Sequence, residues 1–255
     1  MKIAVILRQV PDVVEELVIA ADGRSLAEDE VTYITNEGDE HALEMALILK
    51  SRQAATVTAV GVGGDEARDA LATAVAKGVD EALFVPVPFE HRGDNHRLAA
   101  HLAPAIKSAG YDLVLTGVWA ADQLDAGLAG LLAVHLSLPY VGGLTSVAAE
   151  PAGDKATVRK EFPGGRLGII EVSLPAVLGI QSAEQPPRYA SVSKVSQAKR
   201  TMQMKELSGP LPNVEGVHVS KLMKSETGVK AEMLSGDVER VADGIVRILR
   251  ERGVV

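Results

Sequence analysis

The chain has 255 residues and a formal net charge of −8, and its apolar and aromatic fractions are 47% and 3%. This length allows one large or two small domains with a sizeable core. The chain contains no cysteine, which excludes disulfides, thiolate catalysis and cysteine-based metal or iron–sulfur sites. Its acidic balance and few aromatic side chains argue against nucleic acid as a main partner.

Apolar runs in the chain are short. Those such as residues 128–134 fall far below the roughly 20 residues that a membrane-spanning helix needs. The chain opens on Met1-Lys2 and continues directly into a strand pattern, with no small-residue cleavage site of a signal peptide after it. We therefore expect a cytoplasmic protein that does not insert into a membrane.

Strand and helix patterns alternate through residues 1–136. The predicted strands are residues 2–7, 31–35, 55–62, 82–87 and 113–117. The predicted helices are residues 39–50, 65–77, 96–108 and 127–136. Such alternation predicts an α/β fold with a doubly wound, mostly parallel sheet that helices cover on both faces.

The pattern changes after Pro139. Four further strands are predicted at residues 144–149, 156–162, 167–174 and 176–180. Turn residues join them, so we expect an antiparallel meander that extends the same sheet. From about Gln181 the chain is polar and irregular, with one short candidate strand at residues 217–222.

Helical spacing returns at residues 237–252, where Val238, Val241, Ile245 and Leu249 fall on one face. We expect a nucleotide-binding α/β domain over residues 1–195 and a C-terminal arm with an amphipathic helix over residues 196–255. The apolar face of this helix must dock on another surface, which is either a partner or the chain's own sheet.

Ligands of open parallel sheets bind beyond the carboxyl ends of the strands. Candidate strand ends are residues 7–12, 61–64 and 116–127, and the last of these leads into a predicted helix whose N-terminal N–H groups suit phosphate. Neither of the glycine-containing strand ends, residues 61–64 and 116–127, is a GxGxxG or Walker A motif. Tight turns with Asp122 or Asp125 as a helix cap explain the same pattern.

Single residues at these strand ends have a binding and a structural interpretation. Asn36 has an amide that suits an adenine edge, and it also suits a turn or a helix cap. Trp119, the only tryptophan, fits a cover over a nucleotide or simple packing. The histidine spacing gives no metal-ligand set, and no GxSxG or Ser/His/Asp pattern indicates bond-making catalysis. We expect no enzyme activity of the chain itself.

Five separated tracts together resemble the beta (small) subunit of electron transfer flavoprotein. In chain order they are KIAVILRQVPD, ITNEGDEHALEMALILK, AVGVGGDEARDALATAVAKGVDEALFV, LVLTGVWAADQLDAGLAGLLAVHLSLP and GGRLGIIEVSLPAVLGIQSAEQPPRYASVSKVSQAKR. The resemblance implies a heterodimer with a larger alpha subunit that holds most contacts to FAD. It implies AMP in the small subunit, and electron transfer from dehydrogenases to an acceptor such as a quinone reductase.

The resemblance also implies positions for the nucleotide. Ile6 and Val62 fall where the family offers backbone to adenine, and Asn36 falls on a nucleotide-binding asparagine. The phosphate loop matches residues 117–128. The positions expected to bind in this loop are Gly117, Trp119, Asp122, Ala126, Gly127 and Leu128. The C-terminal helix is expected to dock on the alpha subunit.

Departures from the family fall on both implied sites. Ala126, Gly127 and Leu128 replace amide or hydroxyl side chains, so only backbone donors remain there, and Gly38 replaces an aromatic residue.

The implied partner-docking loop is Ser182, Ala183, Glu184 and Gln185. Ser182 and Glu184 stand where leucines are usual. A carboxylate is costly to bury in an apolar pocket, so the loop suits a different partner from the usual dehydrogenase.

Three alternatives stay open beside the AMP-binding subunit. The first is a bifurcating or partner-specialised beta subunit with a second FAD in place of AMP. The second is a nucleotide-binding hydrolase or ligase of similar fold, against which the missing Walker motif and catalytic set count. The third is a structural module that has lost its nucleotide.

Overall fold

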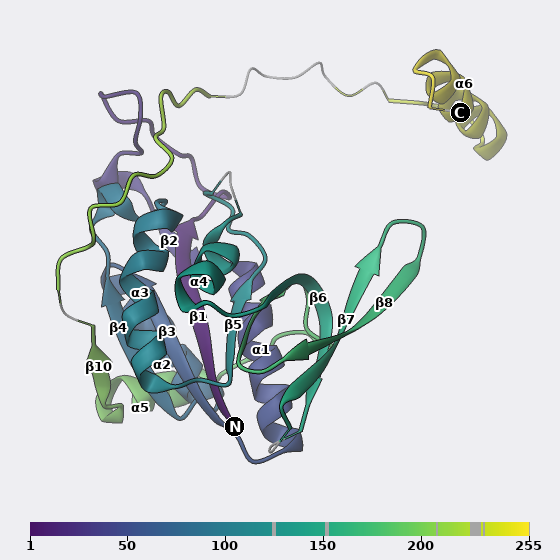
Figure 1. Cartoon of the computed structure of the whole chain (residues 1–255). Coiled ribbons are helices and arrows are strands. Elements are labelled where there is room, and N and C mark those ends of the chain that lie inside the picture. The colour runs from purple at the N-terminus through teal and green to yellow at the C-terminus, as the bar shows by residue number, and fades with distance from the viewer. Residues whose placement is uncertain (124–125, 151–152, 208, 225–230, 232, 255) are drawn as a thin grey trace. The chain divides into compact units, whose positions relative to one another are not determined.

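Within the described part of the chain, ten strands form one mixed sheet in the order β10-β4-β3-β1-β5-β9-β6-β7-β8, with β2 paired to β1 (Figure 1). The computed structural model describes residues 1–123, 126–150, 153–207, 209–224, 231 and 233–254. The chain divides into two units, Met1–Lys221 and Leu222–Val255, and the sheet belongs to the first.

The first half of the chain confirms the predicted alternation of parallel strands and helices. Its parallel strands are β1 (Lys2–Pro11), β3 (Thr56–Gly63), β4 (Glu81–Pro86) and β5 (Leu113–Gly117), and β2 (Tyr33–Thr35) runs antiparallel to β1. Its helices are α1 (Glu37–Arg52), α2 (Asp65–Lys77), α3 (Asn95–Ala109) and α4 (Leu128–Leu136), with 3₁₀ turns at Glu28–Glu30 and Phe89–His91.

Local sequence accounts for the helix ends. Acidic residues occupy the first turn of α1 and basic residues its last turn, which suits the helix dipole. Gly78 ends α2 with a φ of 116°, a left-handed conformation that glycine adopts at little cost. Asp94 caps α3, since its Oδ1 accepts from the Arg97 backbone N–H at 3.0 Å.

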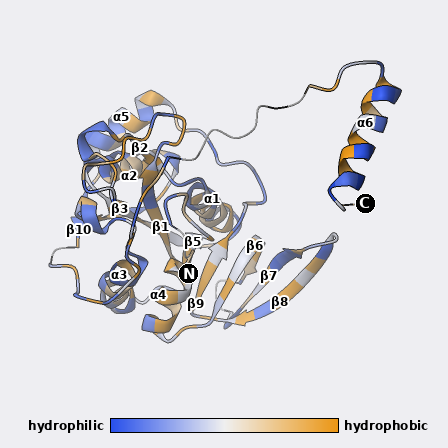
Figure 2. Cartoon of the chain, turned by 90° about the horizontal axis from the view of Figure 1, so that it is seen from above, coloured by the Kyte–Doolittle hydropathy of each residue, from blue (hydrophilic) through white to orange (hydrophobic). Residues whose placement is uncertain are grey.

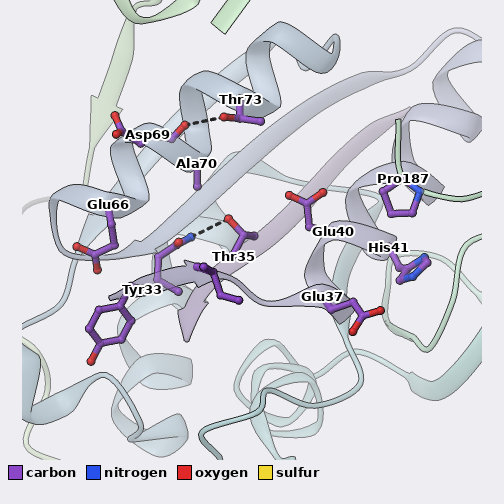
Figure 3. A pocket seen from close by; sticks show the side chains of 12 residues that line it. Tyr33, Thr35, Glu37, Glu40, His41, Glu66, Asp69, Ala70, Thr73 and Pro187 are labelled. Atoms are coloured by element: carbon purple, nitrogen blue, oxygen red, sulfur yellow. Dashed lines mark hydrogen bonds between the residues drawn. The ribbon is translucent and has the colours of Figure 1, made fainter. Parts of the chain in front are cut away.

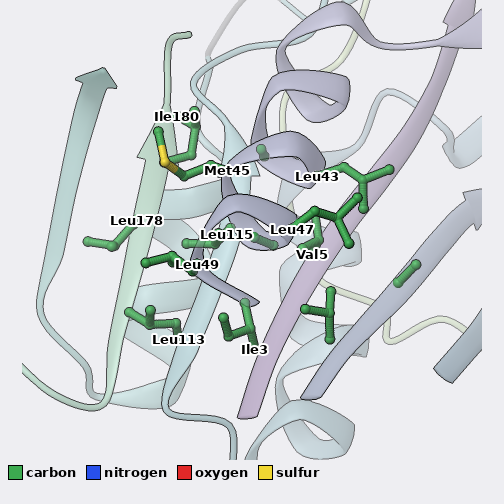
Figure 4. Packing of buried hydrophobic residues seen from close by; sticks show 14 of the residues in the cluster. Ile3, Val5, Leu43, Met45, Leu47, Leu49, Leu113, Leu115, Leu178 and Ile180 are labelled. Carbon is green, nitrogen blue, oxygen red and sulfur yellow. The ribbon is translucent and has the colours of Figure 1, made fainter. Parts of the chain in front are cut away.

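Alternate residues of β1 point to opposite faces of the sheet, so the chain has two cores. Ile3 and Val5 pack with α1 and α2, as Figure 4 shows for the α1 side. Ala4 and Ile6 pack with α3 and α4. Each fully buried isoleucine or valine contributes about 1.5–3 kcal/mol, and nine of the ten residues of β1 are buried at the centre of the sheet.

Three antiparallel strands extend the sheet: β6 (Tyr140–Ala149), β7 (Lys155–Phe162) and β8 (Arg166–Ser173). The predicted fourth strand of this meander, β9 (Ala176–Ile180), lies instead between β5 and β6 and is parallel to both. The physical reason is burial. Every residue of β9 is buried, which suits a strand covered on both faces, whereas β8 keeps many exposed residues and forms an edge.

The segment after residue 181 is more ordered than its polar composition predicts. Helix α5 (Val192–Thr201) packs on α2, where the Lys199 Nζ lies 2.7 Å from Asp69 Oδ1. Strand β10 (Met204–Glu206) then pairs with β4. The described residues 217–222 form no strand, so that prediction is wrong. The free side of β4 is already taken by β10.

The second unit contains α6 (Val238–Glu251), which confirms the predicted C-terminal helix. The Asp237 carboxylate accepts from the Arg240 backbone N–H at 2.9 Å and caps it. Figure 2 shows apolar and charged residues interspersed along α6. None of the described helices is long and apolar enough to span a membrane.

Candidate functional site

The order of the strands reverses at β1. The chain builds outward from β1 through β3 to β4, and then places β5 on the other side of β1. Such a reversal is a topological switch point, and open α/β sheets bind ligands beyond the carboxyl ends of the strands there. In this chain Arg8 of β1 and Gly117 of β5 lie at those ends.

A buried ion pair joins β1 to α1 at the switch point. Arg8 is 3% exposed and Asp39 is 0% exposed. The Arg8 Nη2 lies 2.8 Å from Asp39 Oδ1, while the Arg8 Nε and backbone N both donate to Oδ2 at 2.9 Å. The Asp39 Oδ1 also accepts from the Gly117 backbone N–H at 2.7 Å, so the carboxylate joins three elements.

The same arginine binds the segment that follows β5. Its Nη2 donates to the carbonyl oxygens of Gly117 at 3.2 Å and Trp119 at 3.3 Å, and its Nη1 donates to Gln123 Oε1 at 3.0 Å. The Asn36 Nδ2 adds a bond to the Trp119 carbonyl at 2.9 Å. Residues 117–123, here called the switch segment, are therefore held by side chains from β1 and from the start of α1.

Close backbone contact explains why glycine occupies position 117. A Cβ atom at Gly117 would lie 2.6 Å from the Gly38 carbonyl carbon and 2.8 Å from the Asp39 backbone nitrogen. Position 38 is also crowded, since a Cβ there would lie 3.2 Å from the Gly117 Cα. The glycine at position 38 thus accompanies a tight approach of α1 to the end of β5.

The structure separates the interpretations of Asn36 and Trp119. Asn36 stands at the N-cap position of α1 but makes no capping bond, so the capping interpretation is wrong and its amide joins the switch segment instead. Trp119 is 59% exposed, so its indole is not packed in the core. Ile6 lies near the middle of β1 and Val62 near the carboxyl end of β3, and both side chains are buried in the core beneath α3 and α4.

The start of α4 carries the rest of the predicted loop. Gly127 is the N-cap residue of α4 and has no side chain of its own to cap the helix, so Asp122 does not occupy the N-cap position. Asp125 lies outside the described residues. Leu128 is buried in the core, and Ala126 has a φ of 48°, a left-handed conformation that costs a non-glycine residue about 1 kcal/mol. These positions offer backbone groups rather than polar side chains.

Asp122 is the acidic side chain of the switch segment. Protein atoms around its carboxyl group raise its pKa to about 6 by desolvation, although the residue itself keeps contact with water. The Arg8 charge opposes this rise and the Asp39 charge adds to it.

An open groove of about 610 Å³ lies beside the switch point, between β2, α1, α2 and Pro187 (Figure 3). Glu40 and Asp69 line it and pair with Lys77 and Lys199 respectively. Within the described residues, no group of three or more His, Cys, Asp or Glu side chains is arranged to hold a metal ion. Glu66 also lines the groove and pairs with Arg92, and Glu37 is a fourth acidic residue of the lining. The groove therefore has an acidic lining that basic side chains around it partly neutralise.

The predicted docking loop is bound to its own chain. The Glu184 carboxylate accepts from Arg52 Nη2 at 2.6 Å and from Ser146 Oγ at 2.8 Å. The hydrogen bond from Arg52 holds the pKa of Glu184 below its ordinary value. The Ala183 backbone N–H donates to His41 Nδ1 at 3.1 Å. Ser182 and Ala183 are half-buried, whereas Gln185 is exposed.

A second ion pair holds the end of this loop. The Arg188 Nη2 donates to Glu44 Oε1 at 2.8 Å, and the Arg188 backbone N–H and Nε both donate to Oε2 at 2.9 Å. Burial acts to raise the pKa of Glu44, but the bonds from Arg188 outweigh it and hold the pKa below its ordinary value. The loop is thus attached to α1 at both ends.

A family model described as the electron transfer flavoprotein domain matches residues 24–210. The chain belongs to the electron transfer flavoprotein family. It is 32% identical to the electron transfer flavoprotein subunit beta of Methylophilus methylotrophus over 98% of both chains. It is 36% identical to that of Syntrophomonas wolfei subsp. wolfei over 78% of this chain and 77% of the relative.

A third relative belongs to a named complex. The chain is 30% identical to the caffeyl-CoA reductase-Etf complex subunit CarD of Acetobacterium woodii over 100% of both chains. These likenesses confirm the predicted beta-subunit family of electron transfer flavoprotein. Membership gives the chain a role in electron transfer, in a complex associated with flavin and with an electron transfer flavoprotein alpha subunit.

The sequence interpretation missed the ion pair that organises the site. The sequence patterns place Asp39 only at the start of the predicted helix 39–50 and Arg8 only in the candidate strand end 7–12. A signal existed, because a charged residue within an otherwise apolar central strand needs a buried partner. Asp39 is one of three acidic residues in the first turn of the next helix, with Glu37 and Glu40, so the sequence does not single it out.

Proposed function

We propose that the chain is the small subunit of a heterodimeric electron transfer flavoprotein, with AMP held at the switch point and FAD held mainly by the alpha subunit. The observation that carries this proposal is the family match over residues 24–210, together with the switch segment fixed at the ends of β1 and β5. In this role the subunit is an electron carrier and catalyses no bond-making reaction of its own.

The residues present fit an adenine nucleotide at the start of α4. Helix α4 begins at a glycine N-cap, and a helix N-terminus attracts phosphate through its N–H groups and dipole. Backbone donors at Ala126, Gly127 and Leu128 replace the missing polar side chains in this role. The other proposed contacts are Ile6, Asn36, Val62, Gly117, Trp119 and Asp122.

The proposed partners are the alpha subunit, a donor dehydrogenase and an acceptor oxidoreductase such as a quinone reductase. The subunit acts in the cytoplasm, without nucleic acid. Residues 1–195 form the nucleotide-binding part, and residues 196–255 form the arm whose helix docks on the alpha subunit. Ser182, Ala183, Glu184 and Gln185 form the docking loop for the donor.

A second candidate is a partner-specialised beta subunit with FAD in place of AMP. The likeness to CarD favours it, because that relative is named as part of a reductase–Etf complex and matches over its whole length. In this candidate the heterodimer stays assembled with its partner enzyme, and both flavins remain in the complex.

Mass spectrometry of the nucleotides released from the native heterodimer separates the two candidates. We expect one FAD and one AMP for each heterodimer, in a yellow complex. Two FAD molecules and no AMP would establish the second candidate. A colourless complex without nucleotide, after gentle purification, would exclude both.

A further inference from the structure

The Arg8–Asp39 pair is too deeply buried to be explained by stability alone. Both side chains have lost nearly all contact with water. The cost of removing two charges from water largely cancels their attraction, and replacing such a pair by apolar residues is often neutral or stabilising. A buried ion pair at this position therefore indicates a role in fixing a conformation.

The hydrogen bonds of the pair show which conformation is fixed. Asp39 accepts from the backbone N–H of Gly117, and Arg8 donates to the carbonyl oxygens of Gly117 and Trp119 and to the Gln123 side chain. Four bonds thus run from the pair to the switch segment. A buried charge makes these bonds stronger than those between neutral groups, so movement of the segment would break four charge-assisted hydrogen bonds.

We propose that Arg8 and Asp39 are positioning residues that hold the switch segment in the conformation that binds the nucleotide. This inference rests on the proposed nucleotide site. Arg8 itself does not touch the nucleotide, because its guanidinium is buried against Asp39 and two carbonyl oxygens. The pair acts through the backbone of residues 117–123 and through the direction in which Trp119 is presented.

The chain offers a matched control in the Glu44–Arg188 pair. Glu44 also lies on α1, is 3% exposed, and accepts bidentate bonds from an arginine. This second pair binds the end of the docking loop and makes no bond to the switch segment among the interactions described above. The Arg188 side chain is 40% exposed, whereas that of Arg8 is 4% exposed. The control therefore matches the loss of a buried, arginine-paired carboxylate on α1.

The test uses the heterodimer with the full-length subunit and AMP as the probe. Asp39→Asn and Arg8→Lys are compared with Glu44→Gln. Each protein is freed of nucleotide, and its AMP affinity is measured by calorimetry. Trp119, the only tryptophan of this subunit, is followed by acrylamide quenching in the isolated subunit. Circular dichroism reports whether each variant is folded.

We expect Asp39→Asn and Arg8→Lys to weaken AMP binding by about 5- to 150-fold, the range of typical coupling between linked sites. Trp119 quenching should change in both variants. Glu44→Gln should keep AMP affinity within about twofold of the wild type, because it leaves the switch segment intact.

Three outcomes overturn the inference. The first is that folded Asp39→Asn and Arg8→Lys variants bind AMP like the wild type. The second is that Glu44→Gln loses as much AMP affinity as they do. Unchanged Trp119 quenching beside a loss of affinity would mean that Arg8 or Asp39 contacts the nucleotide directly. If Asp39→Asn does not fold, Arg8→Lys decides, because it retains the charge opposite Asp39.

Failure of the proposed function gives a different result. A wild-type heterodimer that binds no AMP excludes the AMP site itself. The inference is then decided by Trp119 quenching alone, which should still change in Asp39→Asn and Arg8→Lys and stay as in the wild type in Glu44→Gln.

Discussion

Asp122 lies in the switch segment, where neighbouring protein atoms displace part of the water around its carboxyl group. This desolvation raises its pKa from 3.8 to about 6. Because the folded state holds the proton more tightly than the unfolded state, ionisation of Asp122 opposes folding. The opposition is absent below the unfolded pKa and complete above the folded pKa, so it grows as pH rises from about 4 to about 6.

We therefore expect Asp122→Asn to stabilise the subunit above pH 6, by about 1 kcal/mol or less since water still reaches the residue. The gain should vanish near pH 4. Urea unfolding of the wild type and the variant at pH 4 and pH 8 measures the difference. An equal difference at both pH values would show that the carboxyl group does not titrate in this window.

Residue roles at the site were predictable only in part from the sequence. The strand ends were located correctly because parallel strands place their carboxyl ends together. The bonds of Asn36 to Trp119 and of Arg8 to Asp39 join residues 83 and 31 positions apart. No local pattern encodes such a pairing, so a cap and a helical first turn remained the simpler interpretations.

At the scale of elements, the docking loop combines a polar tip with attachment to α1. The Arg52 side chain is 51% exposed, and Glu184 is 21% exposed. Ion pairs of this kind contribute about 1 kcal/mol or less. They therefore fix a local conformation without supporting the whole fold.

We expect Arg52→Ala to raise amide exchange at residues 182–185 by roughly two- to fivefold, the equivalent of a surface ion pair. The melting temperature should stay unchanged. Glu184→Gln should have a similar effect, and the double variant should add little, because both changes remove the same contact. Hydrogen exchange followed by mass spectrometry measures the exchange rates of residues 182–185 in each variant.

Lys155→Ala supplies the control for the loop. It removes an exposed ion pair with Glu171 at 3.3 Å on the β7–β8 hairpin. Exchange at residues 182–185 should not respond to it. Additive effects of the Arg52 and Glu184 changes would contradict a direct coupling between these side chains.

The elements themselves were predicted where periodicity is strong. Central strands and the helices α1 to α4 and α6 follow from apolar patterns and end signals. The place of β9 did not follow, because the same apolar run suits a meander or a central strand until its neighbours are known. Helix α5 is short, mostly polar and buries only Ala198, so an irregular segment was the simpler interpretation of its composition.

At the scale of the molecule, the two units differ in what they contain. The first unit contains the whole sheet and both buried cores. The second contains α6, with Val241, Ile245 and Leu249 spaced along one side. Such a stripe stabilises a helix only when another surface covers it.

We expect deletion of residues 236–255 to weaken binding to the alpha subunit by at least about tenfold, which is about 1.4 kcal/mol. The melting temperature of the isolated subunit should not change, because its cores are intact. Surface plasmon resonance measures the affinity.

Full-length Leu249→Gln should reproduce much of this loss. Arg250→Gln, on the neighbouring residue, should cause little of it. Unchanged affinity after the deletion would mean that α6 has another surface to cover.

The position of β9 has a consequence for the order in which the protein folds. Strand β5 pairs with β1 on one side and with β9 on the other. The ribosome must therefore release residue 180 before the centre of the sheet can close, although β1 leaves first. Long-range parallel pairing is slow and leaves strand edges open meanwhile. Until residue 180 has emerged, β5 keeps one edge without its native partner, and the bond from the Val118 N–H to the Ile180 carbonyl, at the start of the switch segment, cannot form.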